Sequence, residues 1–106
     1  FMAWLCKGLA LAQMGDIDGA INALQTAARL NREDYRALYE AGRIEIESGD
    51  LMSGMDFLLH ALQRNGGIAS IHQALADGYE KAGDKENASL HRKEAQNLIK
   101  KRKKKD

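Results

Sequence analysis

The chain has 106 residues, of which 44% are hydrophobic and 29% are charged, and its formal net charge is +1. This composition is ordinary for one globular domain, and no apolar run approaches the ~20 residues of a membrane-spanning helix. The single cysteine, Cys6, excludes an internal disulfide. Since disulfides are a mark of oxidising compartments, we expect a cytoplasmic protein in one domain, 1–106.

A dipeptide recurs along the chain at a fixed interval. Gly-Asp occurs three times, 34 residues apart, at Gly15-Asp16, Gly49-Asp50 and Gly83-Asp84. A period of this length is typical of stacked-repeat proteins. The interval divides the chain into repeats 1–34, 35–68 and 69–102, followed by a basic tail, 100–106.

Each Gly-Asp is expected to separate two helices. Glycine accepts the positive φ that commonly ends a helix, and aspartate is a favoured N-cap of the next one. Apolar residues with helical spacing flank each dipeptide, no stretch alternates like a strand, and proline is absent. In chain order, the predicted helices are 2–14, 17–31, 35–48, 51–64, 69–82 and 85–103. Each repeat is therefore predicted to be a helical hairpin.

Further columns of the 34-residue alignment hold small residues, which indicate close packing between helices. These columns are Gly8, Gly42 and Ala76; Ala20, Gly54 and Ala88; and Ala27, Ala61 and Ala95. In the first predicted helix, Trp4 and Leu11 share a face with Gly8.

Together these positions resemble the tetratricopeptide repeat (TPR) family. The resemblance covers about residues 1–98, although Arg32, Gly66 and Lys100 stand where the family usually has proline, and Arg92 occupies an apolar place. It implies an all-α fold of three stacked helix-turn-helix repeats in a short right-handed solenoid. It also implies a non-enzymatic protein-interaction scaffold whose first helices line a concave groove. Because the chain begins inside a helix at Phe1, we expect it to be part of a longer array.

The groove is the principal candidate site, and a peptide or helix of a partner protein is its expected ligand. The residues expected to face it are Leu5, Leu9, Arg36, Tyr39, Glu40, Arg43, Ile46, Gln73 and Asp77. Tyr39, Arg36 and Arg43 are the expected anchors, since tyrosine and arginine are common at interface hot spots. The clamp that some TPR domains use for chaperone tails is not expected, because its places hold Leu5, Leu9, Glu40, Ser70 and Ala74.

Two alternative functions remain open. One alternative is that the basic tail binds nucleic acid or another anionic surface, although it could also be a solvated helix end favoured by the helix dipole. The basic residues of this tail are Lys100, Lys101, Arg102, Lys103, Lys104 and Lys105. The rest of the chain, 1–99, has a net charge of −4 and offers no basic face. Alternatively, the chain could self-assemble through the apolar end Phe1–Leu9, or through Met52 and Leu59 on the convex side.

No pattern predicts catalysis, a cofactor or a metal. The chain has no glycine-rich phosphate loop followed by Lys-Ser/Thr and no nucleophile motif. The three histidines, His60, His72 and His91, do not have the helical spacing of metal ligands, and His72 is expected to pack between helices.

Overall fold

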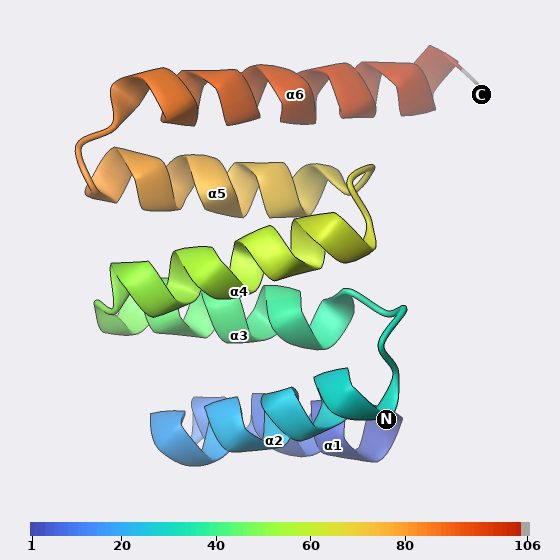
Figure 1. The fold of residues 1–106 in the computed structure, drawn as a ribbon, viewed down its shortest axis with the longest axis vertical. Helices are drawn as coiled ribbons and strands as arrows, with labels where there is room; N and C mark the ends of the chain where they lie inside the picture. The colour runs from blue at the N-terminus through green and yellow to red at the C-terminus, as the bar shows by residue number, and fades with distance from the viewer. Residues whose placement is uncertain (105–106) are drawn as a thin grey trace.

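The chain folds into a stack of helical hairpins, as the repeat predicts. The computed structural model describes residues 1–104, which contain six helices and no strand. The helices are α1 (Met2–Gln13), α2 (Ile17–Leu30), α3 (Arg36–Ser48), α4 (Leu51–Arg64), α5 (Ala69–Lys81) and α6 (Lys85–Lys104). Consecutive pairs form three hairpins, stacked along the longest axis with the first hairpin at one end and the last at the other (Figure 1). Every helix boundary lies within one residue of its predicted position.

The Gly-Asp dipeptides form the three hairpin turns by one mechanism. Gly15, Gly49 and Gly83 have φ values of 88°, 103° and 85°. In the first turn, the N–H of Asp16 donates to the carbonyl of Leu11 over 2.9 Å, which closes the end of α1. The Asp16 carboxylate then accepts from the N–H of Gly19 over 3.0 Å and caps α2. The other two turns repeat these contacts.

The small residues allow each pair of helices to approach closely. Gly42 in α3 faces α4, and a Cβ atom added to it would lie 2.7 Å from Leu58 Cγ and 2.9 Å from the carbonyl oxygen of Gly54. Gly8 has the same relation to Leu24 in the first hairpin. Leu24 and Leu58 are fully buried, so these contacts lie in the centre of the core.

In the third hairpin, different residues occupy the positions of this leucine and glycine. Arg92 replaces the buried leucine, and its guanidinium turns outward to pair with Asp77 and Glu80 on α5. The matching glycine position holds Ala76, which is completely buried. Loss of the large apolar side chain on α6 therefore coincides with the gain of a methyl group on α5.

The face predicted for the first helix is only partly packed. Gly8 is buried, but Trp4 is 38% exposed and lies beneath the ammonium of Lys7, which is 4.9 Å from the ring centroid. Leu38 and His72, at the same place in the later repeats, are buried. Trp4 differs because it belongs to the hairpin at the end of the stack, where no preceding helix in this structure covers it.

Candidate functional site

The first helices of the three hairpins lie side by side and leave two adjoining hollows between them. Contacts join α1 to α3 and α3 to α5. One hollow of about 300 Å³ lies between α1 and α3, and another of about 320 Å³ lies between α3 and α5. Tyr39 and Ser70 line both hollows, so the two hollows form one continuous groove.

All nine residues that the sequence placed in the groove line these hollows. Those in the first are Leu5, Leu9, Arg36, Tyr39 and Glu40. Those in the second are Tyr39, Arg43, Ile46, Gln73 and Asp77. Leu5 and Ile46 belong to the hydrophobic core and form the floor of the groove, while Gln73 and Asp77 are exposed at its edge.

The two groove arginines are paired with carboxylates of the chain itself. Arg43 lies 2.7 Å from Glu40 Oε2 and 3.0 Å from Glu47 Oε1. Arg36 binds Asp34 through Nε and Nη2, and its nearest approach is 2.7 Å. The hydrogen bond to Glu40 raises the pKa of Arg43, and the hydrogen bond between Arg36 and Asp34 raises the pKa of Arg36 and lowers that of Asp34. The positive charges of both arginines are therefore neutralised locally by neighbouring carboxylates.

Tyr39 is the polar side chain at the junction of the hollows. Burial raises the pKa of its phenol, with a further contribution from the negative charge of Glu40. The neutral hydroxyl can donate and accept, and it makes no hydrogen bond to any side chain or backbone atom that the structure describes. An amphipathic ring with a free hydroxyl is suited to anchor a peptide.

The places of the chaperone-tail clamp lie in this groove but carry no cation. They hold Leu5, Leu9, Glu40, Ser70 and Ala74, and each of these residues lines at least one of the two hollows. The groove therefore lacks the donors that such a clamp needs at these positions.

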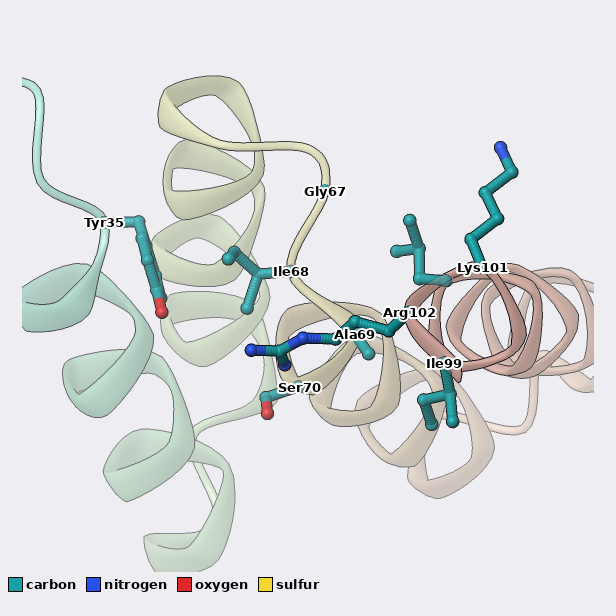
Figure 2. A pocket seen from close by; sticks show the side chains of 9 residues that line it. Tyr35, Gly67, Ile68, Ala69, Ser70, Ile99, Lys101 and Arg102 are labelled. Carbon is teal, nitrogen blue, oxygen red and sulfur yellow. The ribbon is translucent and has the colours of Figure 1, made fainter. Parts of the chain in front are cut away.

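A third and larger hollow was missed by the sequence analysis. Its volume is about 800 Å³, and it extends the groove from Tyr35 and Ser70 to the end of α6 (Figure 2). Lys101 and Arg102 of the predicted tail line it. Lys103 and Lys104 continue the helical backbone, Lys100 is exposed, and Lys105 lies outside the described residues.

The convex candidates are exposed, as expected. Met52 is 86% exposed and Leu59 is 39% exposed, both on α4. Two of the three histidines, which are far apart in sequence, meet between α5 and α6: His72 is buried and contacts His91, while His60 is exposed. Within residues 1–104, no three His, Cys, Asp or Glu side chains gather in a way that could hold a metal ion. None of the helices in this range combines the length and apolar composition needed to cross a membrane.

The hairpin stack and its groove define the class of a short helical-repeat solenoid. Residues 1–34 match the family model of the tetratricopeptide repeat, which confirms the resemblance to this family that the sequence predicts.

Solved structures of MamA contain a region with the fold of this chain. One is 24% identical, with a TM-score of 0.92 over 97% of this chain and 60% of that chain. Another, of MamA MSR-1, is 26% identical, with a TM-score of 0.80 over 89% of this chain and 54% of that chain. MamA from Desulfovibrio magneticus RS-1 is 23% identical, with a TM-score of 0.86 over 95% of this chain and 57% of that chain. The chain thus spans slightly more than half of these structures, and no curated protein matches it.

Proposed function

We propose that the chain is a non-enzymatic protein-interaction scaffold that binds a peptide or helix of a partner in its concave groove. The observation that carries this proposal is the continuity of the two hollows through Tyr39, with all nine expected groove residues on their walls. The tetratricopeptide repeat in residues 1–34 supports it, since proteins of this class are generally scaffolds. The exposed free thiol of Cys6 agrees with a reducing cytoplasm, which is the location we propose.

The binding mechanism is passive. The backbone of the groove is helical, and ion pairs hold Arg36 and Arg43 in place before any ligand arrives. Binding then orders few groups of the scaffold, which lowers the entropic cost of association. Tyr39 supplies apolar area and a hydrogen bond at the centre, while Gln73 and Asp77 offer polar contacts at the edge.

The test is a comparison of single variants on opposite faces of the solenoid. The native chain is used to capture a partner from a lysate of its source, and the isolated partner segment is then titrated calorimetrically against each variant. We expect Tyr39→Ala to weaken binding at least tenfold, because truncation of a central aromatic anchor commonly costs about 2 kcal/mol or more. Met52→Ala, on the convex face, should leave the affinity within a factor of two.

The opposite pattern would reject the groove. If Tyr39→Ala retained the partner at native affinity while its circular dichroism matched the native spectrum, the ligand would have to bind elsewhere. Loss of binding with Met52→Ala alone would move the site to α4.

Self-association through Met52 and Leu59 is a second candidate function, favoured by the exposure of both side chains on one helix. Self-association predicts that the molar mass measured by light scattering rises with concentration. The double variant Met52→Ser/Leu59→Ser should instead have the molar mass of a monomer. A constant monomer mass for the native chain at millimolar concentration would exclude this function.

A further inference from the structure

The hollow at the end of α6 differs in its lining from the rest of the groove. Its apolar lining includes Ile68, Leu98 and Ile99. Lys101 and Arg102 supply its charge. Figure 2 shows the Arg102 side chain extending from α6 over the cavity toward Ser70 and Ile68, whereas Lys101 points outward at the rim.

The extra length of α6 creates this wall. The second helices of the earlier hairpins are followed by the C-cap residues Asn31 and Asn65, whose side chains accept hydrogen bonds from the N–H groups of Glu33 and Gly67. Asparagine in this role turns the chain out of the helix. The third repeat has Ile99 at the same place, which cannot form this turn, and α6 continues to Lys104.

The cavity is also the one part of the groove whose charged lining, within the described residues, is of a single sign. The hollow between α1 and α3 has both Arg36 and Glu40 on its wall, and the hollow between α3 and α5 includes three carboxylates and two cations. Neither Lys101 nor Arg102 forms an ion pair with a carboxylate within residues 1–104. A concave, partly apolar site lined by cations concentrates positive potential and attracts anions.

The cavity opens directly into the groove. Ser70 lines all three hollows, and Tyr35 lines both the cavity and the hollow between α1 and α3. A polypeptide lying across Tyr39 can therefore continue past Ser70 into the cavity without leaving the concave surface.

We propose that this cavity binds an acidic segment of the partner polypeptide, with an apolar side chain on Ile68, Leu98 and Ile99 and carboxylates at Arg102 and Lys101. This assignment rests on the proposed function of the groove and adds the chemistry of its ligand. The volume of about 800 Å³ lies within the range of ~300–1,000 Å³ that is usual for ligand pockets, which suits a few side chains. Arg102 is the specificity-determining residue, since its planar guanidinium can hold a carboxylate through two hydrogen bonds.

A peptide fits these observations better than a membrane or a nucleic acid. The site is a hollow, which a flat bilayer surface does not enter. Nucleic acid carries negative charge along its whole length and would meet the body of the chain, where residues 1–99 carry 10 Lys/Arg and 14 Asp/Glu, whereas the acidic part of a peptide can be confined to the cavity.

The test is fluorescence anisotropy with a defined probe. The probe is a fluorescein-labelled octapeptide with a central Leu-Phe pair and three Glu residues on each side, and its control has Gln in place of every Glu. We expect the native chain to bind the Glu probe and Arg102→Gln to weaken it about tenfold. The control Lys100→Gln, which removes the same charge from an exposed position of α6 outside the cavity, should change the affinity less than twofold.

Several outcomes would overturn the cavity site. These are equal losses for Arg102→Gln and Lys100→Gln, equal binding of the Gln and Glu probes, and no binding of the Glu probe to the native chain. Tighter, Arg102-dependent binding to phosphatidylserine vesicles or to a single-stranded oligouridylate would instead assign the cavity to lipid or RNA and reject a peptide. Both variants must show the circular dichroism and thermal midpoint of the native chain.

Tyr39→Ala distinguishes this proposal from the proposed function. If Tyr39→Ala abolishes probe binding and Arg102→Gln does not, the groove stands and the cavity assignment fails. If Arg102→Gln abolishes binding and Tyr39→Ala has no effect, the probe binds in the cavity alone, and the proposed function of the groove around Tyr39 is not supported.

Discussion

The Nδ1 atoms of His72 and His91 lie 3.0 Å apart across the interface of α5 and α6. The Nε2 atom of His72 lies 3.1 Å from the carbonyl oxygen of Gly66, so this nitrogen carries a proton. In a neutral His72 the Nδ1 atom then accepts, and His91 must donate from its own Nδ1. His91 therefore donates one proton to His72 across this interface, stacks on Tyr79, and connects α6 through His72 to the turn before α5.

This pair makes stability dependent on pH. Burial lowers the pKa of His91 below its ordinary value of 6.5, and the proximity of His72 lowers it further. Because the unfolded chain binds the proton more readily, the contribution of His91 is complete above that ordinary value and is lost as the pH falls toward the folded-state pKa. We expect the free energy of unfolding, measured by urea titration, to decrease between about pH 7.5 and 5.5.

The matched variant His91→Gln removes the titrating group. Its unfolding free energy should change less over the same pH window than that of the native chain. The remaining slope would report other groups, such as Glu45, whose pKa is raised mainly by burial and whose protonation acts in the opposite direction. An identical slope in both proteins would remove His91 as the cause.

The hairpin turns require glycine because of their backbone conformation. Gly49 has a φ of 103°, and no neighbouring atom lies within 4 Å of the position that a Cβ would take. A side chain at this position would therefore be opposed by backbone strain and not by crowding. We expect Gly49→Ala to destabilise the chain by about 1–2 kcal/mol, as for other residues forced into the left-handed region. Chemical unfolding measures the change.

Gly66 provides the control for that substitution. It lies in a loop without positive φ, and a Cβ added to it would meet only the carbonyl oxygen of Leu62, at an ordinary 3.7 Å. Gly66→Ala should therefore alter stability by no more than about 0.5 kcal/mol, or raise it slightly. Equal losses at the two positions would contradict the role of φ at Gly49.

The sequence was sufficient for the repeat architecture because that architecture depends on local chemistry. Gly15 and Asp16 act through hydrogen bonds within a few residues of themselves, and their period reveals the hairpins directly. The residues that line the groove could also be predicted, because the helical period and the family resemblance together divide the first helix of each repeat into a packed face and an unpacked face.

The contacts that the sequence did not predict join residues distant in the chain. His72 and His91 are separated by 19 positions and meet only after α5 and α6 pack. Arg43, which the sequence predicts as an anchor, is paired with Glu40 and Glu47, and the helical spacing of these three residues permits that pairing. The sequence predicts the basic run as a tail, whereas the cavity at Arg102 depends on the continuation of α6 past Ile99, the residue that departs from the Asn31 and Asn65 column.

The contact between Gly42 and Leu58 predicts a non-additive pair of substitutions. A methyl group at Gly42 would overlap Leu58 Cγ and the Gly54 carbonyl, so Gly42→Ala should cost about 1–3 kcal/mol. Leu58→Ala alone should cost about 2–5 kcal/mol by leaving a cavity. The double variant should lose less than the sum, since the new methyl occupies part of that cavity, and a double-mutant cycle measures the difference.

The third hairpin is the internal control for this coupling. It already combines Ala76 with an outward-pointing Arg92, so Ala76→Gly relieves no overlap and should only destabilise, by about 1 kcal/mol. If Gly42→Ala and Leu58→Ala proved strictly additive, the overlap at Leu58 would not be the source of the cost.

Arg64 joins the second hairpin to the first through backbone carbonyls. Its Nη1 atom donates toward the carbonyl oxygens of Ala28, Asn31 and Asp34 at 3.1, 3.1 and 2.9 Å. The same column holds leucine in the other two repeats, so the contact is specific to this interface.

Replacing Arg64 tests how strongly this contact holds the stack together. Arg64→Met retains most of the aliphatic stem but leaves partly buried carbonyls without a charged donor, which we expect to cost about 2–3 kcal/mol. Arg29→Met is the control, because the hydrogen bond that Arg29 makes within residues 1–104 is an exposed one to Thr26 in its own helix, and its loss should cost less than about 0.5 kcal/mol. Hydrogen exchange should show faster opening in the segment between α2 and α3 for Arg64→Met alone. Unchanged protection there would mean that apolar packing, and not the arginine, fixes the first two hairpins against each other.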